Sequence, residues 1–330
     1  MNRRAFLAAS AAAVAGCSRR PPAVVVPGAS PALVPAQAEA RRVHAALMLA
    51  DKPPTATPFT TPKPTVDVVG FIPELKGLIR LTMRLHPHVG DEPKPDESKL
   101  GGQFLWPATE AWPTLPGTDA ALAGILQLRA EDAPPQVTFK PGTDLLQLFW
   151  NPRFADRAPR RELHAEVVWR KRAEVSGDLL ASPLDGAALG RADANSGIWT
   201  DYVPFPCRLA PERVMEFPSW DVLPERMRQT VSDKLPGGAV AYRNELSVAD
   251  GTKIGGYAPA QPDAKPPACP ICRWGMDYLL TIAEAEWTTP NRQPTGAKQP
   301  RAAGLSLGPS AAVHVFVCRR CDAWPIAAVG

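Results

Sequence analysis

The sequence predicts an α+β fold of mainly antiparallel sheets with few helices, and three observations support this fold class. First, 39 of the 330 residues are proline, which is more than twice the average usage of about 5%. Because proline breaks helices and central strands, this content favours short strands, turns and long ordered loops. Second, a hydrophobic content of 45% with 21% charged residues is enough to build a core. Third, a short sequence motif recurs, which indicates an internal duplication.

Residues 1–16 have the pattern of a lipoprotein signal peptide. Arg3 and Arg4 precede an apolar run that ends at Ala15 and is too short to span the hydrocarbon core of a bilayer, about 30 Å thick. The Val-Ala-Gly-Cys stretch that ends at Cys17 resembles the bacterial lipobox. We therefore expect lipid on Cys17 and a membrane anchor in the cell envelope, on the periplasmic side of a Gram-negative cell. The paired arginines also resemble the export signal of folded proteins, and plain secretion with an unmodified cysteine is the alternative.

A proline-rich tether is predicted over residues 17–70, interrupted by one short helix from Ala38 to Ala50. One globular domain follows over residues 71–330. The net charge of +4 includes Arg3 and Arg4, so removal of the signal peptide would leave +2. This small charge argues against nucleic acid as a partner.

The globular part contains an internal repeat, which we divide into halves of about 71–200 and 201–330. A [ST]-K-[LI]-G-G phrase occurs twice at an offset of 154 residues. Downstream, residues 124–132 match 277–286, and residues 145–150 match 313–318 in hydrophobic character. Each half is thus expected to present a Gly-Gly turn followed by two strands. The residues of these turns are candidate ligand-binding positions, because backbone N–H groups and a lysine suit an anion: Lys99, Gly101, Gly102, Lys253, Gly255 and Gly256.

Alternation of apolar and polar residues predicts three of the strands. The segments 79–85 and 163–170 alternate with period two, as in strands that bury one face. The segment 313–317 is apolar on both sides, which is typical of a strand buried on both faces. The clearest helical spacing runs from Asp221 to Leu235.

Four cysteines form two Cys-x2-Cys knuckles in the C-terminal half, separated by 45 residues: Cys269, Cys272, Cys318 and Cys321. Two such knuckles can place four thiolates around one tetrahedral ion, so we expect structural zinc with no open catalytic position. Two disulfides and a rubredoxin-like iron site are the alternatives. The remaining cysteine of the domain, Cys207, is expected to be a small buried hydrophobe.

The sequence resembles the YwqG-like proteins, a bacterial family of unknown function, over about residues 70–330. The segments that carry the resemblance are the two Lys-Gly-Gly phrases, residues 253–261, the first knuckle with Met276-Asp277, and the C-terminal residues 315–325. The resemblance implies a compact, duplicated α+β domain and an interaction role, since some members lie beside toxin–immunity genes. It implies no catalytic residues. This chain departs from the family by its lipobox and tether, by Arg273 where many knuckles have glycine, and by a Gly304–Gly308 turn that lacks an acidic residue.

Three histidines are candidate functional groups. His86 and His88 lie on the same side of an extended segment and could share a metal, although a solvated loop is the favoured interpretation. His314 lies among valines, and we expect a hydrogen-bonded core histidine rather than a general base.

These observations favour an envelope lipoprotein whose domain binds a protein or small molecule without turning it over. No His-Glu-x-x-His helix or dinucleotide fingerprint is present in the sequence, which argues against the enzyme classes that those motifs mark. The alternative is a hydrolase or transferase that binds an anionic substrate at the paired turns of Lys99 and Lys253.

Overall fold

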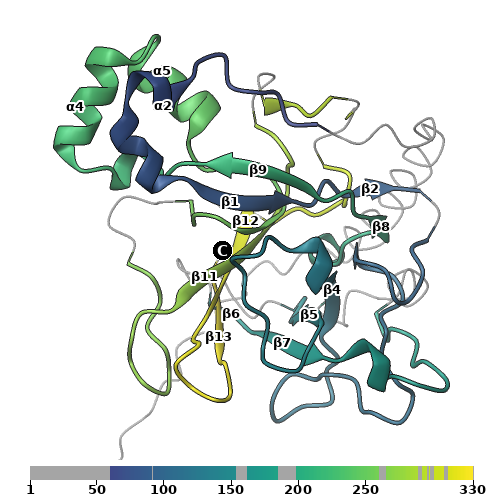
Figure 1. The fold of residues 1–330 in the computed structure, drawn as a ribbon. Helices are drawn as coiled ribbons and strands as arrows, with labels where there is room; N and C mark the ends of the chain where they lie inside the picture. Colours follow the sequence, from purple (N-terminus) through teal and green to yellow (C-terminus); the bar gives the residue numbers. More distant parts are fainter. Residues whose placement is uncertain are drawn as a thin grey trace, which may run out of the picture.

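Two antiparallel sheets share one hydrophobic core in the computed structural model of the chain (Figure 1). The structure describes residues 60–90, 92–153, 162–184, 198–259, 265–288, 292–295, 297, 301–307 and 311–329. The predicted α+β class with antiparallel sheets and few helices is confirmed. Cys17 and the helix predicted from Ala38 to Ala50 lie outside the described residues.

The larger sheet has seven strands and the smaller one six. In spatial order, the larger sheet consists of β6 (Glu162–Leu163), β13 (Ile326–Val329), β12 (Ala312–Val317), β11 (Asp277–Ala283), β10 (Lys253–Gly255), β1 (Arg80–Arg84) and β9 (Glu212–Glu216). The smaller sheet consists of β2 (His88–Val89), β8 (Cys207–Arg208), β3 (Lys99–Leu100), β4 (Ala123–Arg129), β5 (Leu145–Trp150) and β7 (Ala165–Arg170).

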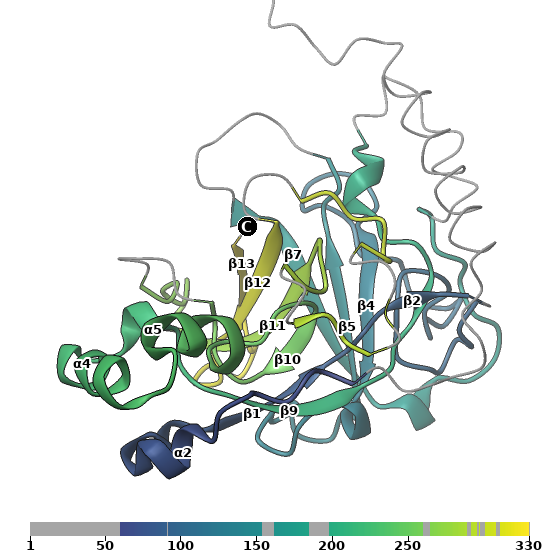
Figure 2. The same ribbon diagram turned by 90° about the horizontal axis from the view of Figure 1, so that it is seen from above.

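Short helices gather at one end of the larger sheet, as Figure 2 shows from above. They pack around a second apolar cluster that includes Ile72, Leu75, Trp220, Val231 and Tyr242. The helical segments of the described chain are α2 (Val68–Phe71), η1 (Pro73–Leu78), η2 (Ala130–Asp132), η3 (Arg172–Glu174), η4 (Thr200–Tyr202), η5 (Trp220–Val222), α4 (Glu225–Lys234), α5 (Gly238–Ala241) and the π-turn η6 (Tyr242–Leu246).

The helix predicted from Asp221 to Leu235 is shorter in the structure. Helix α4 begins at Glu225, and the preceding residues form the separate turn η5. Pro224 accounts for the difference, because a proline disfavours the helical conformation of the residue before it. Leu223 accordingly has the extended angles φ −67° and ψ 137°.

The internal duplication is visible in the register of the strands. Lys99 lies opposite Gln127, and Lys253 lies opposite Thr281, so both residues of the pair shift by 154. The irregularity between Gly124 and Leu126 in β4 recurs at the same offset in β11. A repeated bulge is evidence of a shared backbone plan, because bulges occupy specific positions within related structures.

The sequence match between residues 145–150 and 313–318 was wrong by one residue. Leu148 pairs with Leu126, and Val315 pairs with Leu280, which sets the offset of these strands at 167. The equivalent strands are therefore β5 and β12, over 145–150 and 312–317. A shift of one residue moves every side chain to the other face of the sheet, and apolar character on both faces of this strand concealed the shift.

The two halves exchange their first strands. Strand β1 belongs to the first half but pairs with β10, and β8 belongs to the second half but pairs with β3. The short strand β6 also joins the sheet of the other half through β13. The two repeats are therefore interlocked by strand pairing.

The end of the predicted tether is packed on the domain. Thr60 bridges to Thr295, and the N–H and hydroxyl groups of Thr61 donate to the carboxylate of Glu212. Val68 is buried at 4% exposure. Residues 60–70, which the sequence assigned to the tether, thus contact the globular part.

Candidate metal centre

The first knuckle is a tight hairpin before β11. The N–H of Cys269 donates to the carbonyl of Trp274 at 2.8 Å, and the N–H of Arg273 donates to the carbonyl of Cys269 at 2.9 Å. Arg273 has φ +63°, the left-handed conformation that favours glycine. An arginine therefore occupies a backbone conformation that glycine adopts more readily, and the hairpin holds it there.

The second knuckle connects β12 to β13. Cys318 follows the last residue of β12, and its N–H donates to the carbonyl of Pro325 at 2.9 Å. The N–H of Trp324 donates to the carbonyl of Cys321 at 2.9 Å, which closes the turn. The antiparallel pairing of β11 with β12 brings the two knuckles together, because Asp277 lies opposite Val317.

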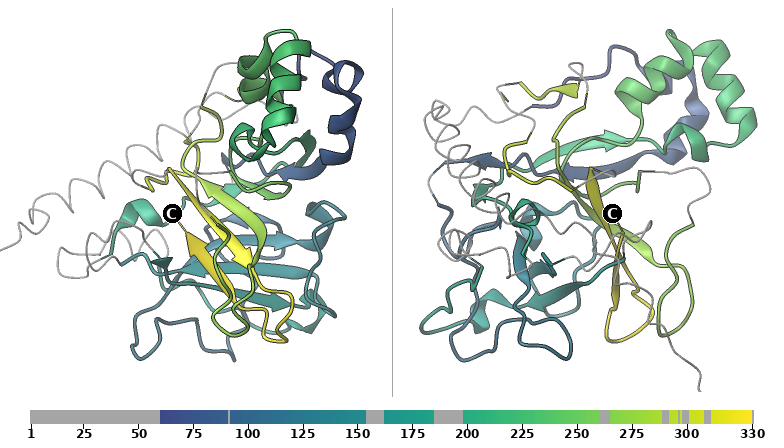
Figure 3. Two further views of the ribbon diagram at one scale, coloured as in Figure 1. Left: turned by 90° about the vertical axis from the view of Figure 1, so that its left-hand side faces the viewer. Right: turned by 180° about the vertical axis from the view of Figure 1, so that it is seen from behind.

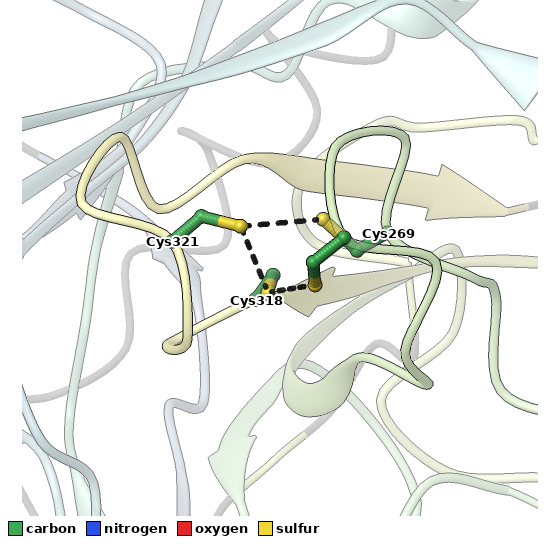
Figure 4. A group of neighbouring side chains, drawn as sticks. Cys269, Cys318 and Cys321 are labelled. Atoms are coloured by element: carbon green, nitrogen blue, oxygen red, sulfur yellow. Dashed lines mark hydrogen bonds between the residues drawn. The ribbon is translucent and has the colours of Figure 1, made fainter.

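The sulfur atoms of the four predicted cysteines all lie within 4.8 Å of one another. Figure 4 shows the side chains of Cys269, Cys318 and Cys321 pointing toward one another. The Sγ–Sγ distances are 3.9 Å for Cys269–Cys321, 3.6 Å for Cys272–Cys318 and 3.9 Å for Cys318–Cys321. Four thiolates at about 2.3 Å from a tetrahedral ion lie about 3.8 Å apart. The tetrad is therefore arranged to hold a metal ion.

The pKa values of two thiols in the tetrad, Cys269 and Cys321, shift in opposite directions. Although desolvation raises the pKa of Cys269, the N–H groups of Cys272 and Ile271 stabilise the thiolate and lower this pKa to about 6. Desolvation and the neighbouring thiols raise the pKa of Cys321 to about 12. A metal ion would supply the positive charge that lets all four groups ionise together.

Apolar side chains pack around the tetrad, and an ion pair joins the second knuckle to the start of β11. Phe316 and Met276 pack against the buried Cys269 and Cys318. Outside this layer, the guanidinium of Arg319 lies 3.3 Å from Asp277.

The two lysines of the repeated turns are buried, and each ammonium group binds the chain itself. Lys99 donates to the carbonyls of Gln103, at 2.7 Å, and of Lys94. Lys253 donates to the carbonyl of Tyr257 at 2.8 Å and to both carboxylate oxygens of Glu216 at 2.8 and 2.9 Å. In both halves the lysine thus binds the carbonyl four residues later and closes its Gly-Gly turn.

Burial changes the proton affinity of both lysines. Desolvation lowers the pKa of Lys99 to about 8, against the opposing effect of Glu92, Glu97 and Asp96. Desolvation also lowers the pKa of Lys253, and Glu216 opposes it. The two turns lie in different sheets, at β3 and at β10.

The glycines of these turns permit a close approach of a carboxylate. Gly102 and Gly256 have φ +69° and +75°. A Cβ atom on Gly256 would lie 1.9 Å from Oε1 of Glu216, and one on Gly102 would lie 3.1 Å from Oε1 of Glu92. Only glycine combines this conformation with this clearance.

Sequence reasoning missed the carboxylates that complete the turns. Glu216 accepts the N–H of Tyr257, and Glu92 accepts the N–H of Gln103 at 3.1 Å. Glu92 and Glu216 are 124 residues apart, which is also the offset between the exchanged strands β8 and β1. A search for a second, shorter offset in the sequence could have found this pair.

Each lysine also belongs to a row of side chains across its sheet, all of them polar except a valine at one end. Residues directly opposite each other on antiparallel strands project on the same face. In the larger sheet the row consists of Glu212, Arg84, Lys253, Thr281, His314 and Val329. In the smaller sheet it consists of His88, Arg208, Lys99, Gln127, Gln147 and Val168.

The burial of Thr82 and Arg84 in β1 corrects the expectation for the segment 79–85. Its polar side was predicted to face solvent, yet Thr82 and Arg84 are 0% and 1% exposed. The Arg84 guanidinium donates to the carbonyl of Glu286 at 2.6 Å and to the hydroxyl of Thr61 at 2.8 Å. The N-terminal segment around Thr61 covers Arg84. This end of the strand is therefore buried on both faces, although its sequence alternates apolar and polar residues.

The structure also gives the surroundings of His86, Cys207 and His314. His86 is buried at 2% exposure and lies 2.8 Å from Glu212, which corrects the expectation of a solvated loop. Cys207 is fully buried, as expected, and desolvation raises the pKa of its thiol. His314 is hydrogen-bonded through Nδ1 to the hydroxyl of Thr281 at 2.9 Å, also as expected.

A comparison with protein-family models and with curated proteins finds no match for the chain. The resemblance to the YwqG-like proteins therefore stays a prediction. Within the part of the chain that the structure describes, no helix has the length and apolar character needed to cross a membrane.

Proposed function

We propose that the protein is an envelope lipoprotein whose duplicated domain is a non-catalytic binding module, stapled in its second half by structural zinc. The closed tetrad of Cys269, Cys272, Cys318 and Cys321 carries this proposal. A zinc ion with four protein thiolates has no position left for a water or a substrate, so its contribution is to stability.

Zinc is favoured over disulfides by the spacing of the sulfur atoms. The shortest of the three Sγ–Sγ distances given above is 3.6 Å, between Cys272 and Cys318, whereas a disulfide requires about 2.05 Å. All four thiols are free in the structure. Iron fits the same tetrahedral sulfur set, and we favour zinc because a staple needs no redox chemistry.

A binding role is favoured over catalysis by the state of the titratable groups. Lys99 and Lys253, which the enzymatic alternative requires for an anionic substrate, are 0% exposed and bind carbonyl or carboxylate groups of the chain. An ammonium group in this position stabilises a turn. The burial of both lysines therefore argues against the hydrolase or transferase alternative.

Metal analysis of freshly purified protein tests the staple. We expect about one zinc per chain and four thiols that react with an alkylating reagent only after chelation. Two disulfides found by mass spectrometry would refute the staple, and iron with the absorption of a tetrathiolate site would replace zinc.

The anchor and the binding role have separate tests. Replacement of Cys17 by alanine should abolish labelling with a lipid precursor, and equal labelling of the variant would remove the lipoprotein from the proposal. Crosslinking in intact envelopes, followed by purification, should recover a partner. Substrate turnover that one point mutation abolishes would contradict a non-catalytic module.

A further inference from the structure

The first knuckle ends in an exposed tip that combines apolar and cationic side chains. Ile271 and Trp274 are 62% and 60% exposed, although they flank the buried Cys269 and Met276. Scattered apolar residues are common on protein surfaces. Here, however, two large ones lie three residues apart on one hairpin, beside the exposed Arg273.

The tip is held in a defined shape before any partner arrives. Backbone hydrogen bonds close the hairpin between Cys269 and Trp274. The guanidinium of Arg320, from the second knuckle, lies over the Trp274 ring at 4.1 Å from its centroid. An aromatic side chain that is already ordered loses little conformational entropy on binding, which makes it an efficient anchor.

The charge of the tip points to an acidic partner. Arg273 and Arg320 are exposed, and within the described parts of the chain neither forms an ion pair. Arg319, by contrast, is paired with Asp277 at 3.3 Å. Two cationic groups that form no ion pair in the described parts of the chain, set beside an apolar anchor, are complementary to a segment that carries carboxylates next to an apolar residue.

The position of the tip favours a protein over the membrane as the occupant. In Figure 1 the knuckle loops, below β11 and β13, lie at the opposite end of the domain from the purple start of the described chain, and both views of Figure 3 agree. A lipid anchor on Cys17 would reach the domain at that start, near Thr60. The tip would therefore lie at the end of the domain remote from the attachment of the tether.

We propose that this tip, formed by Ile271, Arg273, Trp274 and Arg320, binds a short acidic segment of a partner protein. The proposal rests on the proposed function as a binding module and assigns the surface that performs it. Two exposed apolar side chains are too few for a globular interface of about 800 Å² per partner, so a linear segment is the fitting occupant. Its apolar residue contacts Trp274 and Ile271, and its carboxylates pair with the two arginines.

The test uses the full chain with Cys17→Ala, so that lipid does not contribute to binding. The probe is a fluorescein-labelled peptide of alternating glutamate and leucine, compared by anisotropy with the same peptide carrying lysine in place of glutamate. We expect saturable binding of the acidic peptide alone. Trp274→Ala and Arg320→Glu should each weaken it about tenfold or more, which corresponds to about 1.4 kcal/mol.

Matched controls lie elsewhere on the surface. Trp199 is 49% exposed and Arg226 is exposed in α4, so Trp199→Ala and Arg226→Glu should leave the affinity unchanged. Each variant must keep the metal content and melting temperature of the parent protein. This requirement separates failure of the tip from failure of the zinc-stapled module.

Three results would overturn the proposal. They are the absence of binding at millimolar peptide, equal weakening by the tip variants and their controls, and tip-dependent binding to phosphatidylglycerol vesicles in place of the peptide. If envelope crosslinking recovers a partner in spite of Trp274→Ala and Arg320→Glu, the module binds through another surface and the tip is refuted alone.

Discussion

The two halves of the domain fix the same loop differently. In the first half, the loop between β3 and β4 packs against one face of its sheet. In the second half, the corresponding loop between β10 and β11 ends in a cysteine knuckle. Phe149 in β5 and Phe316 in β12 are equivalent residues at the centre of the two arrangements. Phe149 packs against Phe104, Trp106 and Trp112. Phe316 packs beside Cys269, Met276 and Cys318.

The comparison teaches how one backbone plan can hold the same loop by two kinds of chemistry. The first-half cluster buries Phe104, Trp106, Trp112, Leu122 and Phe149, and hydrophobic burial is sufficient to order its loop. The second-half cluster has one aromatic residue, two cysteines and one methionine in its buried centre. Because this centre has fewer large apolar side chains, we expect metal coordination at the tetrad to order the loop.

The largest expected effect comes from breaking the tetrad. Cys318→Ser should release the metal and destabilise the second half, because coordination stores binding free energy as folding free energy, on the order of 10 kcal/mol in small zinc modules. Denaturant unfolding and metal analysis measure the change. Cys207→Ala is the control, since Cys207 is equally buried but should keep the metal. A Cys318→Ser protein with unchanged stability would show that the tetrad is not a staple.

Removal of the aromatic centre should destabilise the first half without affecting the metal. Phe149 is fully buried, and Phe149→Ala should lower the free energy of unfolding by about 3–5 kcal/mol through lost burial and a cavity. Trp274→Ala, at an exposed aromatic residue, should change it by less than about 0.5 kcal/mol. Loss of metal from the Phe149→Ala protein would indicate that the two clusters are coupled, contrary to the comparison.

The two buried lysines should differ in their importance. Lys253→Met leaves the buried Glu216 carboxylate without its ion-pair partner, at a cost of about 3–5 kcal/mol. Lys99 donates to carbonyl groups, so Lys99→Met should cost about 1–3 kcal/mol. Urea titrations of both variants measure the difference, and adding Glu216→Gln to Lys253→Met should recover part of the stability, because the amide is neutral and its oxygen can still accept an N–H of the turn. Equal costs would show that the carboxylate is unimportant.

The smallest effect concerns pH and the equivalent residues His314 and Gln147. Burial, together with the charge of Lys253, lowers the pKa of His314 to about 4, below the value of about 6.5 in an unfolded chain. The unfolded state therefore takes up a proton first as the pH falls, and stability decreases from about pH 6.5 toward pH 4.

His314→Gln places the first-half residue at this position and should keep a hydrogen bond to Thr281. Between pH 7 and pH 5.5, the wild-type protein should lose about 1 kcal/mol more stability than the variant. Measurement of unfolding at these two pH values, with the metal content verified at each, tests the difference. Parallel curves for the two proteins would contradict a depressed pKa of His314.

Local patterns were sufficient to predict the fold class, the duplication and the cysteines that form the tetrad. The Lys-Gly-Gly phrase recurs because its backbone conformation requires glycine, as at Gly102 and Gly256. The two Cys-x2-Cys knuckles are recognisable because two residues between ligands fit one tetrahedral ion. Such constraints act within a few residues, so they remain visible in a single sequence.

The tertiary structure alone decided which strands pair and which polar groups are buried. Period two shows that β1 has two faces but does not reveal that Thr61 and Glu286 cover Arg84 on one of them. The exchange of β1 and β8 between the sheets joins residues more than 100 positions apart. Pairing of this kind depends on the free energy of the whole core, and no local pattern records it.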